Sequence, residues 1–276
     1  MDKSCGCCVA VLLVASFRLC AQNTESSRGF TWYESFEGSV NSLGVVTRLD
    51  STAGYNFDSH FSVAGGIPVY FVAASSATRA ATGNRSFNGI GNVYGEFTLT
   101  LDNPVVNFAS TFTATAPTGD EAIGLSTGHV TVDWSNNFER TFSRLTPFGD
   151  LGFANSVSDT AFFIRPYQTY GSIVHWQAGA RYRLFKTISA AGSAYGVEPL
   201  GSQTLVSRLS RVFGTGNIAT GSDLTRDHGI SAWAEVSSGS HVEFFAGYTH
   251  STRYSLDTLF FGVGVSMGKV LRHGGI

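Results

Sequence analysis

Charged side chains are scarce in this chain, and lysine is scarcest of all. Charged residues make up 14% of the sequence, against about 25% in an ordinary soluble domain. Only three residues are lysine: Lys3, Lys186 and Lys269. A water-facing surface of this size normally carries more charge. The formal net charge of −2 also provides no basic surface, so we expect no nucleic-acid partner.

Cysteine is absent after residue 20, and no hydrophobic run is long enough for a membrane helix. The apolar run from about Cys5 to Phe17 is too short to span a bilayer and has the length of a secretory signal core. We expect cleavage after Ala21, which leaves a mature chain without disulfides. A lipoprotein attached through Cys20 is the alternative, but Arg18 and Leu19 stand where small residues are usual.

Helical periodicity is also missing beyond residue 29, and alternation with a period of two replaces it. The stretch SIVHWQAGARYRLF at 172–185 shows it well. One face carries Val174, Trp176, Ala178, Ala180, Tyr182 and Leu184, and the other carries His175, Gln177, Gly179, Arg181 and Arg183. We predict twelve such strand segments, at 30–38, 44–57, 60–72, 90–102, 104–116, 128–138, 141–153, 168–184, 187–198, 228–237, 240–250 and 256–268.

The connections between these segments alternate in length. Short turns are predicted at 56–60, 102–104, 136–140, 184–187 and 237–241, with longer polar loops at 73–89, 117–127, 154–167 and 199–227. Outer-membrane barrels have short periplasmic turns, long outer loops and an even number of strands. We therefore predict an all-β, antiparallel transmembrane β-barrel of 12 strands in the outer membrane of a Gram-negative-type envelope. A secreted soluble β protein is the alternative.

This prediction divides the chain into four parts. Residues 1–21 form a signal peptide, 22–29 a short N-terminal segment, 30–269 the barrel and 270–276 a short C-terminal tail. The face of 172–185 with Trp176 then contacts lipid, and the face with His175 lines the lumen.

The loop PTGDEAIGLSTG at 117–128 carries a family resemblance. Its Pro-Thr-Gly and Ser-Thr-Gly steps resemble the Pro-Thr-Gly…Gly-Thr-Gly loop of the phenol-degradation meta-pathway transporter-like family, with Ser126 in place of a smaller residue. The resemblance covers about residues 40 to 269 in layout, and a dozen residues in motif. It implies an outer-membrane barrel that passes small, often aromatic or hydrophobic compounds. Turn chemistry alone also explains Gly119, Gly124 and Gly128 as positions of positive φ.

Charged side chains gather on the predicted lumen face. They are Arg48, Asp50, Glu96, Asp133, His175, Arg181, Arg183, Glu235, His241 and Glu243. They could fill the lumen as a plug of ion pairs, or line a channel and set its selectivity. In the longest loop, Leu205, Leu209 and neighbouring apolar residues recur at helical spacing, with Arg208 and Arg211 off that face. We predict an amphipathic turn here that acts as a gate. A mobile polar loop whose apolar spacing is coincidental is the alternative.

No set of catalytic residues is visible, so we expect no enzymatic activity, no cofactor and no metal. His60-Phe61-Ser62 has the His-x-Ser spacing of outer-membrane phospholipases, but parity directs Ser62 into the lumen at a periplasmic turn. Ser126, His129 and Asp133 could be assembled into a triad only with unspecified geometry. The sequence favours a porin-like channel or passive transporter, with outer-membrane lipids, lipopolysaccharide and small solutes as partners. A lipid-modifying enzyme and a structural or adhesive barrel are the alternatives.

Overall fold

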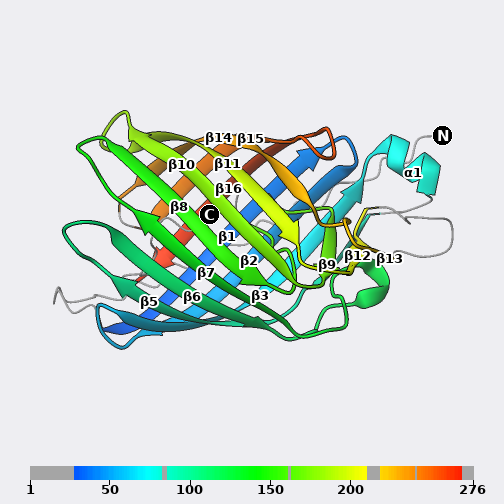
Figure 1. The fold of residues 1–276 in the computed structure, drawn as a ribbon, viewed down its shortest axis with the longest axis horizontal. Helices are drawn as coiled ribbons and strands as arrows, with labels where there is room; N and C mark the ends of the chain where they lie inside the picture. The colour runs from blue at the N-terminus through cyan, green and yellow to red at the C-terminus, as the bar shows by residue number, and fades with distance from the viewer. Residues whose placement is uncertain (1–27, 83–85, 161–162, 210–217, 240, 269–276) are drawn as a thin grey trace, which may run out of the picture.

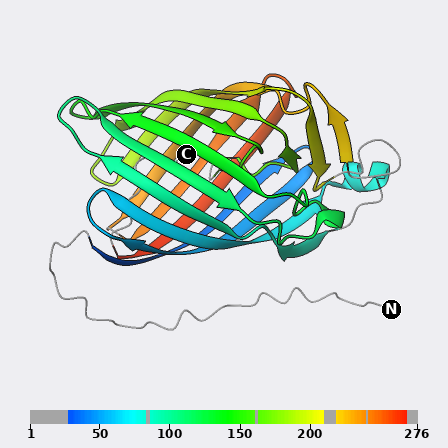
Figure 2. The same cartoon turned by 60° about the horizontal axis from the view of Figure 1, so that its bottom comes forward.

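Twelve long antiparallel strands close into a barrel in the computed structural model, which describes residues 28–82, 86–160, 163–209, 218–239 and 241–268. Each strand pairs with its neighbour along the chain, and β1 pairs with β16 to close the circle. Figures 1 and 2 show the strands running obliquely around the barrel. The strands are β1 (Gly29–Asn41), β2 (Gly44–Asn56), β3 (Phe61–Ala74), β5 (Tyr94–Leu101), β6 (Asn107–Thr115), β7 (Thr131–Glu139), β8 (Leu145–Ala154), β10 (Ile173–Arg183), β11 (Ile188–Pro199), β14 (Asp227–Ser238), β15 (Val242–Ser251) and β16 (Leu256–Met267). The predicted fold class is confirmed.

Several short elements lie at one end of the barrel, which we call the loop end (Figure 1). They are the helix α1 (Ser76–Thr82), the 3-10 turn η1 (Glu121–Ile123) and the strands β4 (Phe87–Ile90), β9 (Tyr167–Tyr170), β12 (Gln203–Ser207) and β13 (Ile218–Gly221). Strands β9, β12 and β13 form a separate small sheet. No helix of the described residues is long and apolar enough to cross a membrane.

The opposite end, which we call the turn end, carries only short connections. They cover 57–60, 102–106, 140–144, 184–187 and 239–241, close to the predicted turns. The prediction that every short turn lies at this end is wrong in two places. Segments 42–43 and 252–255 are short turns at the loop end. The first is tight because the Asn41 side chain accepts hydrogen bonds from the backbone of Leu43 and Gly44.

One predicted strand is divided in the structure. Segment 168–184 breaks at Gly171, whose φ of 141° lies where glycine is favoured. Residues before the break belong to β9, which pairs with β12 and not with the barrel. The break turns the chain from the small sheet at the loop end into β10.

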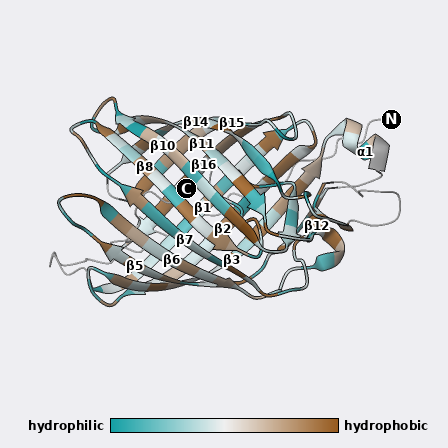
Figure 3. Ribbon diagram, in the orientation of Figure 1, coloured by the Kyte–Doolittle hydropathy of each residue, from teal (hydrophilic) through white to brown (hydrophobic). Residues whose placement is uncertain are grey.

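The outer surface of the barrel is apolar, as the alternating colours along each strand in Figure 3 illustrate. On β10, Trp176 is 40% and Tyr182 45% exposed, whereas His175 and Gln177 face an internal cavity. The other strands repeat this pattern. Their exposed apolar side chains include Phe36, Phe71, Phe97, Phe112, Trp134, Phe138, Leu151, Phe153, Phe244, Leu259 and Phe261. An apolar surface of this extent suits lipid better than water.

An aromatic cluster fills part of the interior. Phe148, Trp233 and Phe260 are at most 8% exposed and pack with Phe245. Gly247 makes room for them, because a Cβ there would lie 2.5 Å from Phe260 and from Trp233. The cluster occupies the side of the lumen formed by β8 and β14 to β16.

Candidate functional site

A cavity of about 490 Å³ occupies the remaining interior. Thr31, Asn56 and Ser62 line it near the turn end, and Asn92, Gln168 and Arg208 line it near the loop end. It therefore extends along most of the barrel. Hydroxyl groups dominate the wall between these ends, from Thr52, Thr98, Thr111, Thr113, Thr131 and Ser135. Such a wall can hydrogen-bond water and polar solutes.

A segment between β8 and β9 folds into the barrel and narrows the loop end. We call residues 155–166 the mouth loop; residues 161–162 lie outside the described part. Ile164 is fully buried, and its backbone N–H donates to the Ser39 hydroxyl of β1 at 2.9 Å. The Tyr70 hydroxyl of β3 donates to Asp159 of the loop at 2.8 Å. The loop therefore starts at β8 and contacts the wall formed by β1 and β3.

A buried ion pair fixes the mouth loop. Nη2 of Arg208 lies 2.8 Å from Oδ2 of Asp159, and these side chains are 1% and 6% exposed. Burial disfavours the charged form of Asp159, but the Arg208 guanidinium and the backbone N–H of Arg165 outweigh it, so the pKa of Asp159 is lowered. Arg208 also donates to the Arg165 carbonyl at 2.9 Å and stacks on the Tyr70 ring at 4.4 Å.

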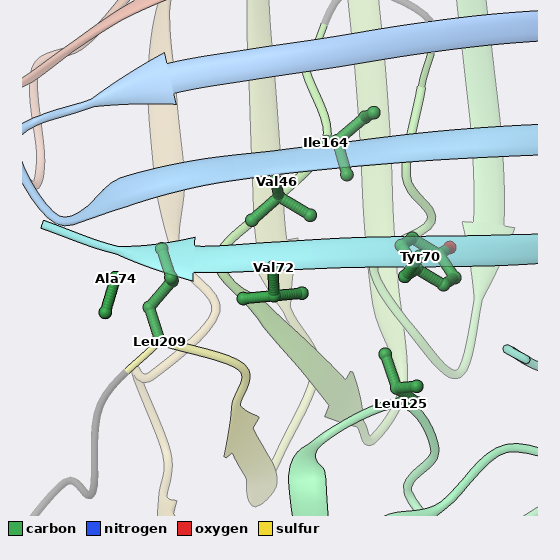
Figure 4. Close-up of a cluster of buried hydrophobic side chains, with 7 residues drawn as sticks. All are labelled: Val46, Tyr70, Val72, Ala74, Leu125, Ile164 and Leu209. Atoms are coloured by element: carbon green, nitrogen blue, oxygen red, sulfur yellow. The ribbon is translucent and has the colours of Figure 1, made fainter. Parts of the chain in front are cut away.

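Apolar contacts reinforce this closure (Figure 4). Leu125, Leu209 and Ile164 of the mouth loop form one buried cluster with Val46, Tyr70, Val72 and Ala74, in which Leu209 lies near Ala74 and Leu125 near Tyr70. Leu125 belongs to the 117–128 loop, where Gly124 and Gly128 have positive φ as expected. Gly119 does not have a positive φ, and that expectation is wrong. Glycine is needed there for close approach, because a Cβ would lie 2.5 Å from the Leu125 carbonyl oxygen.

A second charged group lies deeper on β7, β8 and β10. Nε2 of His175 is 3.1 Å from Asp133, and its Nδ1 is 3.6 Å from Asp150. Asp133 also accepts a hydrogen bond from the Ser158 hydroxyl of the mouth loop at 3.1 Å. All four side chains line the cavity.

Half of the ten predicted lumen residues line the cavity. They are Arg48, Asp50, Glu96, Asp133 and His175. Arg48 pairs with Glu37, directly opposite on β1. The other five lie nearer the turn end. Arg181 pairs with Glu235 at 3.1 Å, and Glu243 accepts from the Tyr33 hydroxyl at 2.7 Å. Arg183 is exposed, as is His241, whose Nδ1 is 3.1 Å from the Ser266 carbonyl oxygen.

The predicted gate has a different structure from the one expected. Leu205 belongs to strand β12, so the expected helical turn is wrong over 203–207. Residues 203–207 form a strand because β12 pairs with β9 on one side and with β13 on the other. The local sequence does not indicate these partners. Arg208 and Leu209 are buried in the closure described above. Arg211 lies outside the described residues.

Sequence reasoning missed four residues of the site: Asn137, Asp150, Asp159 and Arg165. Asp150 was obscured because the segment 141–153 was predicted to begin inside a turn. With β8 starting at Leu145, alternation directs Asp150 inward. Asp159 and Arg165 have no periodic signal, since their loop has no regular structure. The triad considered for Ser126, His129 and Asp133 does not form, because His129 stacks on Tyr170 while Asp133 contacts His175.

Solved structures that share this fold include an outer-membrane channel and a porin. An outer-membrane channel from Pseudomonas putida F1 superposes with a TM-score of 0.57 and 9% sequence identity, covering 90% of this chain and 100% of that chain. A NanC porin superposes with a TM-score of 0.51 and 6% identity, covering 86% of this chain and 100% of that chain. No family model and no curated protein matches the sequence. The similarity thus concerns the barrel fold, and the family resemblance of the 117–128 loop stays a prediction.

Proposed function

We propose that this chain is an outer-membrane channel through which small solutes diffuse. The observation that carries the proposal is the polar cavity, which extends from Thr31 and Ser62 to Gln168 and Arg208 inside a closed barrel. The apolar exterior supports insertion into lipid, since a closed barrel satisfies its backbone hydrogen bonds without water. The fold shared with an outer-membrane channel and a porin is consistent with this function.

The loop lengths support one orientation. Short turns face the periplasm in outer-membrane barrels, and longer loops face outward. We therefore assign the turn end to the periplasm and the loop end, with its mouth loop, to the lipopolysaccharide side. Export through the signal peptide predicted at 1–21 fits this placement, although those residues lie outside the described part.

The proposed solute class differs from the one that the family resemblance implies. Hydrophobic or aromatic solutes need an apolar path, but the aromatic cluster of the interior is buried within itself. The open wall carries hydroxyl and charged groups. These features favour small polar solutes.

Planar-bilayer recording on purified protein tests the proposal. We expect discrete conductance steps in potassium chloride from protein that shows heat-modifiable mobility on a gel. Liposomes containing the protein should swell in small polar solutes such as glycerol. Correctly folded barrels that give neither conductance nor swelling would refute the channel.

A further inference from the structure

Two acceptor groups without hydrogen-bond donors lie side by side on the cavity wall. Asn137 of β7 stands directly opposite Asp150 of β8. Asn137 is 8% exposed, and its Oδ1 has no partner among the described residues. Among the described residues, the one charged partner of Asp150 is His175 at 3.6 Å, a distance within ion-pair range but too long for a hydrogen bond. We call Asn137 and Asp150 the acceptor pair.

An acceptor buried without a donor, such as Oδ1 of Asn137, is costly for the folded protein. The Asp150 side chain is 19% exposed, and its carboxylate faces the cavity with acceptor capacity unused. Both side chains line the cavity, so a donor can reach them only from its contents. Water can supply such donors, but a positively charged group supplies them together with a countercharge for the Asp150 carboxylate. The acceptor pair therefore suits an ammonium group.

Arg165 of the mouth loop carries a hydrogen-bond donor that lacks an acceptor in the described part of the chain. The residue is 6% exposed, and its Nε has no hydrogen-bond partner among the described residues. Within the same part of the chain, no carboxylate oxygen lies within 4.0 Å of its guanidinium. It donates to the Ser158 carbonyl and stacks on the Phe163 ring at 4.9 Å. A buried guanidinium without a carboxylate is costly, and it suits an anionic ligand.

Both features line one cavity and are connected through Ser158, Asp133 and His175. The Ser158 carbonyl accepts from Arg165, and its hydroxyl donates to Asp133. Asp133 in turn holds His175, which contacts Asp150. The mouth loop thus brings a cationic group to the same cavity as the acceptor pair.

We propose that the cavity contains a subsite for a small zwitterion, a solute with an ammonium and a carboxylate group as in an amino acid. The ammonium donates to Asp150 and Asn137, and the carboxylate accepts from Arg165. This inference rests on the proposed channel function and specifies its solute class. Neither group alone satisfies both features, so the zwitterion binds more tightly than an amine or a carboxylic acid of the same size.

Calorimetry on the detergent-purified barrel tests the inference with glycine, methylammonium and acetate as probes. We expect glycine to bind at least ten-fold more tightly than either of the others. In Arg165→Gln, glycine should no longer bind more tightly than methylammonium. In Asp150→Asn, glycine should no longer bind more tightly than acetate. Arg165→Lys, which keeps the charge, should restore part of the first advantage. Arg183→Gln, which changes an exposed arginine near the turn end, is the matched control and should leave all three affinities unchanged.

Heat-modifiable mobility identifies variants that have folded, and the comparison of the three probes on the wild-type protein needs no variant. Glycine that binds no more tightly than methylammonium or acetate would overturn the inference, as would a full glycine advantage in folded Arg165→Gln. The same preparation in planar bilayers separates this inference from the channel proposal. Conductance without a glycine advantage refutes only the zwitterion subsite, whereas a glycine advantage without conductance refutes only the channel.

Discussion

Replacing Arg208 with methionine is expected to open the loop end of the barrel. The side chain keeps much of its length and its apolar contacts, but Asp159 loses the cation 2.8 Å away. Removing one partner of a buried ion pair costs about 3–5 kcal/mol. Tyr70 and the backbone of Arg165 still donate to Asp159, at 2.8 and 2.9 Å, which places the cost near the lower limit of that range.

The other anchors of the mouth loop are of similar strength. Burying the Ile164 side chain contributes about 2 kcal/mol. The hydrogen bond from its backbone to Ser39 contributes about 1 kcal/mol. A loss of about 3 kcal/mol therefore makes the docked and released loops comparable in free energy. We expect Arg208→Met to increase single-channel conductance while the barrel stays folded.

A reporter thiol measures the release directly. Val157 in the mouth loop is 8% exposed, and expression from residue 22 leaves no other cysteine in the chain. Val157→Cys should react with a water-soluble maleimide much faster when Arg208→Met is present. Adding Asp159→Asn should slow the reaction again, because no unpaired carboxylate remains. Wild-type conductance and labelling rate in folded Arg208→Met would show that the ion pair does not hold the loop.

Two further predictions concern the strand faces and acidic pH. Arginine at Ala178, on the outer face of β10, should lower the free energy of unfolding in lipid by about 2–4 kcal/mol, and arginine at Gln177, on the inner face, by much less. Urea titration measures both, and equal losses would show that the assigned faces are wrong. Since the pKa of Asp159 is lowered, its ion pair stabilises the docked loop above the ordinary aspartate value and is lost only as pH falls towards the lowered pKa. Single-channel conductance should therefore stay near its value at about pH 8 down to about pH 5 and rise only below about pH 4; a rise near pH 6 would assign the transition to another group.

Period-two alternation made the barrel wall predictable from sequence. The pattern depends only on which side of a strand each residue takes, and membrane and lumen impose it on every strand. The stretch 172–185 therefore placed His175 and Gln177 on one face, and the barrel predicted from the whole chain made that face the inner one. The same rule failed for Asp150, because four turn residues, 141–144, were counted as part of the strand. Phe142 and Arg144 fall on the same face as Asp150, so that face had no clear polar or apolar character.

The loop end could not be predicted in the same way. The apolar spacing from Leu205 to Phe213 fits a helix, yet residues up to Ser207 form β12, because β9 and β13 are available on either side. These neighbours are distant in sequence, and no local pattern identifies them. Asp159 and Arg208 are 49 residues apart in sequence (208 minus 159) and belong to different loops. The sequence around either residue therefore does not indicate that the two form an ion pair.

The charged side chains of the interior fall into two groups: those paired with an opposite charge of the protein, and those with hydrogen-bonding capacity left unused. At the mouth, Arg208 and Arg48 have carboxylates within ion-pair distance, so their main effect is to hold the loop and the wall in place. Around Asp150 and Arg165, the described part of the chain leaves Nε of Arg165 and Oδ1 of Asn137 without hydrogen-bond partners, and Asp150 has only His175 at 3.6 Å. A protein that needed these charges only for stability would pair them with each other. Their separation across Ser158 is what a channel needs if it is to hold a solute briefly and release it.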